Sequence, residues 1–161
     1  MIEIKEVSMT KEVLEIIRGI DLQFYPNIGS IDWYLARYKP WHTSFVAMDD
    51  GEIVGYLTSL PARKELYDAI LSGVLIDDIG INPDMFLKES EYRYVESMVI
   101  RTEYRGRNIS EQLFDAFFDR YGGKKACAIA INKEGYRLGE HHSFSLAKEL
   151  SGGVGIFVSG D

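Results

Sequence analysis

Residues 95–114 constrain the fold more than any other stretch of the chain. The stretch at 95–100, which is apolar except for Glu96 and Ser97, has the composition of a buried strand. A short basic turn that contains a glycine follows at 105–110, and the spacing of apolar residues over 110–121 predicts an amphipathic helix. A strand that turns into a helix presents free backbone N–H groups at the helix N-terminus, so this turn is a candidate anion site.

Length and charge predict one soluble domain. A chain of 161 residues with 46% hydrophobic content fits a single domain over 1–161, since domains most often have about 100–150 residues. The net charge of −7 argues against a nucleic-acid-binding surface and is compatible with a weak attraction for cationic amines. The N-terminus lacks signal-peptide features, and no apolar run reaches the roughly 20 residues that span a bilayer. We therefore expect a cytoplasmic protein with no nucleic-acid or membrane partner.

Cysteine and histidine usage predicts no metal. A single cysteine excludes an internal disulfide framework and a cysteine-based zinc site. Because apolar residues flank Cys127, we interpret it as a core thiol rather than a nucleophile. His141 and His142 are adjacent, so they diverge on a helix, and no third ligand is spaced to join them.

The rest of the chain alternates between strand and helix patterns. The residues at 49–51, Asp-Asp-Gly, lie between two β-branched and aromatic runs and predict a β-hairpin. The nearly all-apolar run at 125–131 predicts a central strand covered on both faces. The class is α/β or α+β with a mixed sheet. Strands are expected at 2–7, 43–48, 52–58, 94–100, 125–131 and 154–158, and helices at 13–20, 31–38, 64–71, 110–121 and 138–150.

Three segments outside the turn bear on what the protein binds. The aromatic residues around Trp33 and Trp41 form either a core wall or one side of a pocket, and the core is favoured. The irregular segment at 61–92, with an apolar piece at 74–81, is long enough to shape an acceptor pocket. The last strand, 154–158, is expected at a sheet edge, where a second copy of the chain can pair with it to form a homodimer.

The turn resembles the signature of the GNAT superfamily, the acyl-CoA-dependent N-acyltransferases, which is Gln/Arg-x-x-Gly-x-Gly/Ala between a strand and a helix. The turn consists of Arg105, Gly106, Arg107, Asn108, Ile109 and Ser110. It matches at Arg105 and differs at Asn108 and Ser110, where the family has Gly and Gly/Ala. The approach at 96–104, the hairpin and the order of elements also resemble the family. The resemblance implies a mixed, mostly antiparallel central sheet flanked by helices.

The two departures can be judged physically. Asparagine tolerates a left-handed backbone better than other side chains after glycine, so Asn108 can keep the loop geometry, although its side chain can also narrow the site. Ser110 is small, can cap the helix and can donate its hydroxyl to a phosphate. We expect the backbone amides of 105–110, with Arg105 and Arg107, to bind the pyrophosphate of coenzyme A.

The resemblance also implies a reaction and its residues. Acetyl-CoA is the expected co-substrate, with no metal, and a primary amine of a small molecule or peptide is the expected acceptor. Backbone groups of Val99 and Ile100 are implied to pair with the pantetheine arm. The family's splayed strands place the arm beside the strand that ends at Asn132, whose side chain is often a coenzyme contact.

Direct attack by an amine requires a base and an acid. Glu96 lies where many members of the family carry Glu, and a carboxylate within an apolar strand invites a raised pKa; the alternative is an ion pair with Arg93. The family often uses a tyrosine as acid, at a position that falls near Gly139. Tyr136 lies one turn earlier and is the candidate, with simple packing as its alternative.

Two other functions stay open. The altered loop and the missing tyrosine are also compatible with a non-catalytic acyl-CoA-binding or interaction module. A small α/β domain that binds no nucleotide is the third possibility.

Overall fold

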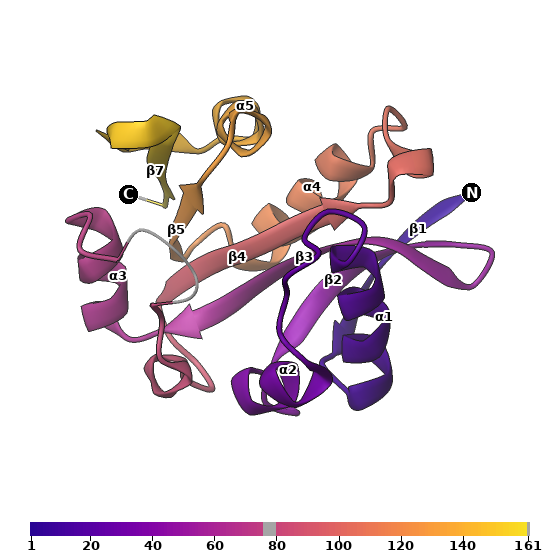
Figure 1. The fold of residues 1–161 in the computed structure, drawn as a ribbon. Coiled ribbons are helices and arrows are strands. Elements are labelled where there is room, and N and C mark those ends of the chain that lie inside the picture. Colours follow the sequence, from indigo (N-terminus) through magenta and orange to yellow (C-terminus); the bar gives the residue numbers. More distant parts are fainter. Residues whose placement is uncertain (76–79, 161) are drawn as a thin grey trace. The chain divides into compact units, whose positions relative to one another are not determined.

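The structure, a computed structural model, describes residues 1–75 and 80–160. Strands and helices are interspersed along the chain (Figure 1). The strands are β1 (Ile2–Ser8), β2 (Thr43–Asp49), β3 (Glu52–Ala62), β4 (Tyr92–Ile100), β5 (Lys125–Ala130), β6 (Ser145–Leu150) and β7 (Val154–Ser159). The helices are α1 (Lys11–Asp21), α2 (Ile31–Arg37), α3 (Lys64–Leu71), α4 (Ile109–Tyr121) and α5 (Lys133–His141), with short 3-10 turns at Pro83–Met85, Thr102–Tyr104 and Ser151–Gly153.

Within the described residues, the strands form one seven-stranded sheet in the order β1-β2-β3-β4-β5-β7-β6. The neighbours β4 and β5 run parallel, whereas β1–β2, β2–β3, β5–β7 and β6–β7 run antiparallel. The predicted mixed, mostly antiparallel sheet with flanking helices is confirmed. No helix of this described part combines the length and apolar character that a bilayer span requires.

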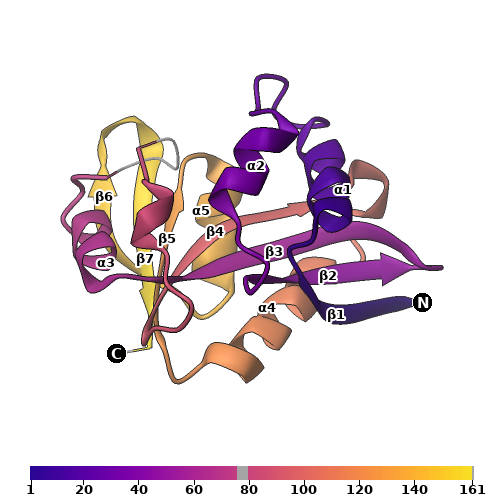
Figure 2. The same cartoon turned by 90° about the horizontal axis from the view of Figure 1, so that it is seen from below.

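The chain divides into two compact units, one of Met1–Thr58 with Ser97–Arg120 and one of Ser59–Glu96 with Tyr121–Asp161. In the first unit, α1 and α2 lie on one face of the strands and α4 lies on the other (Figure 2). Thr10 caps α1, because its hydroxyl accepts a hydrogen bond from the backbone N–H of Val13. Ser30 caps α2 in the same way, because its hydroxyl accepts a hydrogen bond from the backbone N–H of Trp33.

The hairpin between β2 and β3 has the two-residue turn that its sequence demands. Asp50 and Gly51 both have positive φ, at 48° and 82°, which is the combination of a type I′ turn. The turn sets the register by pairing Asp49 with Glu52. The prediction of two antiparallel strands at this point is confirmed.

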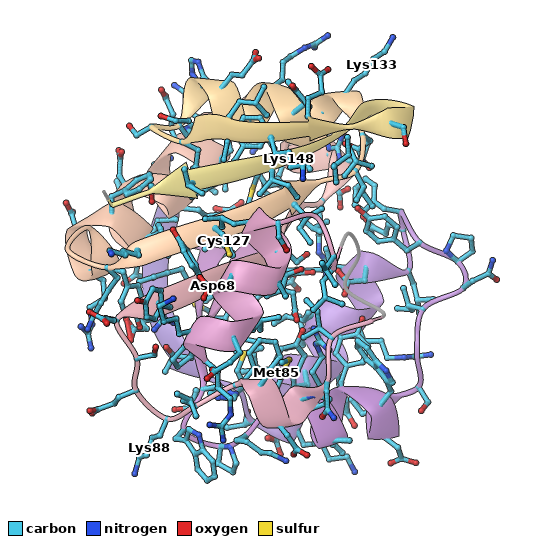
Figure 3. All side chains as sticks on the ribbon, turned by 90° about the vertical axis from the view of Figure 1, so that its left-hand side faces the viewer. Asp68, Met85, Lys88, Cys127, Lys133 and Lys148 are labelled. Atoms are coloured by element: carbon cyan, nitrogen blue, oxygen red, sulfur yellow. The ribbon has the colours of Figure 1, made fainter. Side chains whose placement is uncertain are left out.

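In the second unit, the strands are covered by α3 in front and α5 behind in the view of Figure 3. The parallel ladder of β4 and β5 extends from the pair Tyr92 and Lys125 to the pair Val95 and Ala128. Cys127 lies inside this unit (Figure 3) and is fully buried. Burial raises the pKa of its thiol to about 12, so the thiolate is scarce at neutral pH, as expected of a core residue.

Two predictions for the C-terminal part are wrong. The helix predicted over 138–150 ends at His141, and Ser145–Leu150 forms β6 instead. Ser143 has a left-handed φ of 62°, which turns the chain so that β6 can pair with β7. The strand at 154–158 is not an edge, because β7 lies between β5 and β6, and β6 takes the edge.

The prediction that the aromatic residues around Trp33 and Trp41 belong to the core is correct for only some of them. Tyr34 and Tyr38 are buried. Trp33 and Trp41 are 42% and 52% exposed, so they do not form a core wall. The short helix α2 turns the face with Tyr34 toward the core, and Trp33 falls on the adjacent face. The predicted apolar piece at 74–81 lies partly outside the described residues, at 76–79.

Candidate functional site

The turn from β4 into α4 has the backbone geometry of an anion-binding loop. Gly106 has a φ of 80° and Asn108 a φ of 57°. A turn with left-handed residues can bring successive N–H groups into one concavity. The left-handed geometry predicted for Asn108 is confirmed. An added Cβ at Gly106 would meet no atom within 4 Å, so the space beside the loop is open.

The first turn of α4 adds donors to this loop. The helix begins at Ile109, and the carbonyl of Asn108 accepts the N–H of Gln112 at 3.2 Å. Ser110 is therefore inside the first turn and is not the cap that the sequence suggests. Its hydroxyl makes no hydrogen bond within 1–75 and 80–160. The first four N–H groups of a helix have no partner within the helix and carry a partial positive charge, so these groups fit a diphosphate.

Two arginine side chains of the loop pack against aromatic rings. The Arg105 guanidinium carbon lies 4.6 Å from the centroid of the Phe24 ring, and that of Arg107 lies 4.8 Å from that of Tyr104. Both arginines are exposed. Cation–π contacts of this kind restrict a long side chain at low cost, so both charges stay near the loop.

A hydrogen bond ties the loop to the β2–β3 hairpin, and the sequence did not reveal it. The Tyr104 hydroxyl donates to Asp49 Oδ2 at 3.1 Å, and the amino terminus of Met1 lies 3.2 Å from Oδ1. The amino terminus and then the Tyr104 hydroxyl lower the pKa of Asp49. The bond to Asp49 in turn raises the pKa of Tyr104. The loop is thus anchored at its N-terminal side.

The end of β4 holds the two residues implied to meet pantetheine. Val99 is buried and Ile100 is half-buried. An added Cβ at Gly55 would lie 3.2 Å from the Val99 carbonyl oxygen and 3.2 Å from Ile100 Cγ1. Glycine at 55 therefore permits a close approach of β3 to this end of β4. Arg101 continues the contact, because its N–H donates to the Val54 carbonyl at 2.9 Å.

A buried polar network lies beside this strand end, and sequence reasoning missed it. Asp21, at the end of α1, is only 8% exposed. Its Oδ2 accepts the Tyr34 hydroxyl at 2.6 Å, and its Oδ1 accepts the Tyr56 hydroxyl. The Tyr56 oxygen also lies 3.0 Å from Ser97 Oγ. Burial, followed by the Asp21 charge, raises the pKa of Tyr56 well above its ordinary value.

In the second unit, Glu96 follows the last pair of the parallel ladder. That pair is Val95 and Ala128, and the Glu96 side chain is half-buried. Arg93, its alternative partner, donates from Nε to Ser59 Oγ at 3.0 Å and from Nη2 to the Ser59 carbonyl at 2.9 Å. Its guanidinium also lies 3.6 Å from the Tyr121 ring centroid. Both the catalytic and the ion-pair interpretation of Glu96 stay predictions.

Asn132 and Tyr136 open the next helix. Asn132 is the cap of α5, and its Oδ1 accepts the N–H of Gly135 at 2.8 Å. This bond leaves the two amide hydrogens of Asn132 for another acceptor. Tyr136 is half-buried and packs edge-on against Phe157, with ring centroids 5.1 Å apart. Burial, reinforced by nearby carboxylates, raises the pKa of Tyr136, so the phenol keeps its proton.

The position where the family usually has its tyrosine has no space for a side chain here. An added Cβ at Gly139 would lie 2.8 Å from Phe157 Cδ1, closer than real Cβ atoms approach. The departure at 139 therefore follows from the packing of Phe157. Tyr136, one turn earlier, contacts the same ring.

The adjacent residues His141 and His142 differ in their burial. His141 is exposed and His142 is buried, with ring centroids 4.8 Å apart. Across residues 1–75 and 80–160, no group of three or more His, Cys, Asp or Glu side chains is arranged to hold a metal ion.

The predicted site residues thus fall into two sets. The first unit brings together Val99, Ile100 and the loop at 105–110. The second unit contains Glu96, Asn132 and Tyr136, of which the last two share the first turn of α5.

Comparison with known proteins addresses the fold and the family. The model of the acetyltransferase (GNAT) family matches residues 11–138. No protein with a curated description matches the sequence.

Three solved structures share the fold. Arabidopsis thaliana NAA60 in complex with acetyl-CoA is 18% identical with a TM-score of 0.67, covering 98% of this chain and 97% of that one. The loading GNATL domain of CurA from Lyngbya majuscula is 13% identical with a TM-score of 0.69, covering 99% and 98%. The ribosomal-protein-S18-alanine N-acetyltransferase from Escherichia coli is 10% identical with a TM-score of 0.66, covering 98% and 93%.

Proposed function

Because the chain belongs to the GNAT acetyltransferase family, we propose that it transfers an acetyl group from acetyl-CoA to a primary amine of a small molecule or peptide. Residues 1–161 form the single domain of this proposal. The observation that carries it is the loop with positive φ at Gly106 and Asn108, which opens onto the N-terminus of α4. A protein of the same fold, Arabidopsis NAA60, binds acetyl-CoA, which supports this co-substrate.

The coenzyme is held in this proposal by backbone and side-chain groups of the named residues. The amides of 105–110 and the Ser110 hydroxyl bind the pyrophosphate, with Arg105 and Arg107 adding positive charge. Backbone groups of Val99 and Ile100 pair with the pantetheine arm. The free amide hydrogens of Asn132 donate to a further coenzyme oxygen.

The proposed reaction is direct attack of the amine nitrogen on the thioester carbonyl. Glu96 accepts the proton that the amine nitrogen loses, directly or through water. The new C–N bond forms as the C–S bond breaks, and the leaving thiolate takes a proton from the Tyr136 phenol. A phenol is protonated at neutral pH, as a general acid has to be at the start of the reaction.

Three departures from the family pattern keep a second function under test. Asn108 and Ser110 stand where the family has glycine or alanine, and Gly139 stands near the position of its usual tyrosine. A non-catalytic acyl-CoA-binding module has the same loop without the chemistry. Turnover separates the two functions.

The test combines calorimetric titration with acetyl-CoA and release of free CoA over a panel of primary amines. We expect binding, and turnover with at least one amine. Glu96→Gln should keep acetyl-CoA affinity and lower kcat by about 10²–10⁴-fold. Glu91→Gln, which changes an exposed carboxylate nearby in the same unit, is the matched control and should leave kcat unchanged.

Each other outcome points to a different conclusion. Binding without turnover for any amine supports the module. Neither heat nor a thermal shift at millimolar acetyl-CoA rules out both functions.

The proposal includes a homodimer, but the strand through which two copies can pair differs from the predicted one. Pairing through a C-terminal sheet edge has to use β6, because β7 is enclosed by β5 and β6.

A further inference from the structure

The network around Asp21 fixes the direction of a hydrogen-bond chain. Tyr34 donates to one carboxylate oxygen and Tyr56 to the other. A phenol has one hydrogen, so the Tyr56 hydrogen is committed to Asp21. The hydrogen between Tyr56 and Ser97, whose oxygens are 3.0 Å apart, therefore comes from Ser97.

This direction leaves Ser97 with one chemical character. A serine hydroxyl normally donates one hydrogen bond and accepts up to two. Here its only hydrogen is given to Tyr56, so toward any ligand the oxygen acts as an acceptor. This hydrogen-bond chain ends on the Asp21 carboxylate. Because hydrogen bonds in series polarise one another, the Ser97 oxygen is a stronger acceptor than the oxygen of an isolated hydroxyl.

Burial decreases along the hydrogen-bond chain from Asp21 to Ser97, so that Ser97 is its most accessible member. Asp21, Tyr34 and Tyr56 are buried, whereas Ser97 is half-buried and its contact with Tyr56 is only partly buried. Ser97 directly follows Glu96 in β4 and precedes Val99 by two residues. The accessible end of this hydrogen-bond chain thus lies in β4, the strand that carries the proposed pantetheine contacts.

We propose that Ser97 binds the acceptor amine by accepting a hydrogen bond from its N–H group, and that Tyr56 and Asp21 are positioning residues that fix the Ser97 hydroxyl. This inference rests on the proposed function and names a residue that recognises the same substrate. An amine or ammonium group supplies the N–H that an acceptor-only oxygen requires, whereas a ligand carbonyl or ether oxygen, which offers only lone pairs, is disfavoured.

The orientation of the side chain favours the amine over the coenzyme. The Ser97 hydroxyl contacts Tyr56, whose other partner, Asp21, belongs to α1, so the Ser97 side chain faces α1. In the proposed function, the coenzyme occupies the loop at 105–110 and meets the strand through the backbone groups of Val99 and Ile100. The buried carboxylate behind Ser97 also favours a cationic ligand.

The test compares three variants of the full chain with one accepted amine. Ser97→Ala removes the acceptor, and Tyr56→Phe keeps the ring but releases the Ser97 hydroxyl. Tyr34→Phe is the matched control, because it removes one hydrogen bond to the same carboxylate and leaves the chain from Ser97 through Tyr56 to Asp21 intact. The readouts are KM for the amine, kcat, and the calorimetric Kd for acetyl-CoA.

We expect Ser97→Ala to raise KM for the amine by about tenfold and Tyr56→Phe by about threefold, the range of one hydrogen bond. Tyr34→Phe should leave KM unchanged even if it lowers the unfolding midpoint as much as Tyr56→Phe does. The Kd for acetyl-CoA should stay constant in all three. Ser97→Thr, which keeps a hydroxyl, should restore KM to within about twofold.

Several results would overturn the assignment. An unchanged KM in Ser97→Ala, or equal effects of Tyr34→Phe and Tyr56→Phe, would show that the network is structural. A weaker Kd for acetyl-CoA in Ser97→Ala would assign the hydroxyl to the coenzyme instead. If the wild-type protein turns over no amine, the proposed function fails and this inference fails with it, a result distinct from active wild type with unaffected variants.

Discussion

The chain turns twice from a strand into a helix through an asparagine, and the two turns use that residue in opposite ways. Asn108 contributes its backbone: its φ is 57° and its carbonyl accepts the first N–H of the helical ladder, from Gln112. Asn132 contributes its side chain: its backbone is extended, and its Oδ1 accepts the N–H of Gly135.

The difference decides which helix N-terminus is available to a ligand. At α5, the asparagine side chain already satisfies one of the free N–H groups. At α4, no side-chain oxygen of Asn108 or Ser110 makes a hydrogen bond within the described ranges, so the helix donors face the open loop. A sequence that reads Asn before a helix thus predicts a cap or an anion site, and the backbone conformation chooses between them.

The largest expected effect is on kcat and tests the role of Tyr136, which follows the second turn, the one at Asn132. An added Cβ at Gly155 would lie 2.5 Å from Tyr136 Cε2, so Gly155→Ala should displace the Tyr136 phenol. If Tyr136 is the acid, kcat falls by about 10²-fold. Tyr136→Phe is the companion variant, because it removes the hydroxyl and keeps the ring that packs against Phe157. Gly155→Ala should also lose roughly 1–3 kcal/mol of stability by overpacking, and an unchanged kcat in Tyr136→Phe would remove Tyr136 from the mechanism.

The next effect tests the first turn. A β-branched residue in the left-handed region costs about 1–2 kcal/mol, so Asn108→Val should weaken acetyl-CoA binding by roughly tenfold as the loop loses its bound geometry. Asn108→Gly keeps a positive φ at no steric cost. Calorimetric titration of both variants is the measurement. A Kd that is the same in the valine and glycine variants would contradict a backbone role for this residue.

A smaller effect separates the cap at Asn132 from coenzyme contact. Asn132→Ala should lower the free energy of unfolding by about 1 kcal/mol, because the N–H of Gly135 loses its acceptor. Asn132→Ser keeps a capping oxygen and should retain most of this stability, as measured by urea denaturation. Neither variant carries the amide hydrogens, so both should bind acetyl-CoA more weakly. Unchanged affinity in Asn132→Ser would limit the residue to capping.

The smallest effect concerns the arginines of the first turn. Arg105→Gln and Arg107→Gln should each raise the Kd for acetyl-CoA a few-fold at low salt, and the difference should disappear near 1 M salt, where the screening length is about 3 Å. Arg120→Gln, at the other end of α4 and paired with Glu6 at 3.8 Å, is the control. A change in Kd that persists at high salt would point to a direct hydrogen bond rather than to an exposed charge.

The sequence by itself determined the features that depend on neighbouring residues. The hairpin at 49–51, the helix at 64–71 and the left-handed backbone of Asn108 are as predicted. Each follows from the steric preferences of a few adjacent residues, which act before any distant contact forms. The family resemblance had the same origin, since its signature is one such turn, and so the sequence alone was enough to predict an anion site there.

Tertiary structure alone decided the features that join distant residues. The bonds from Tyr34, Tyr56 and Ser97 that build the Asp21 network span 13, 35 and 41 residues, and no local pattern encodes such a pairing. The segment at 145–150 became a strand because β7 offered it a partner, against its helical spacing. The missing tyrosine at Gly139 was likewise explained only by Phe157, 18 residues later, whose ring occupies the space.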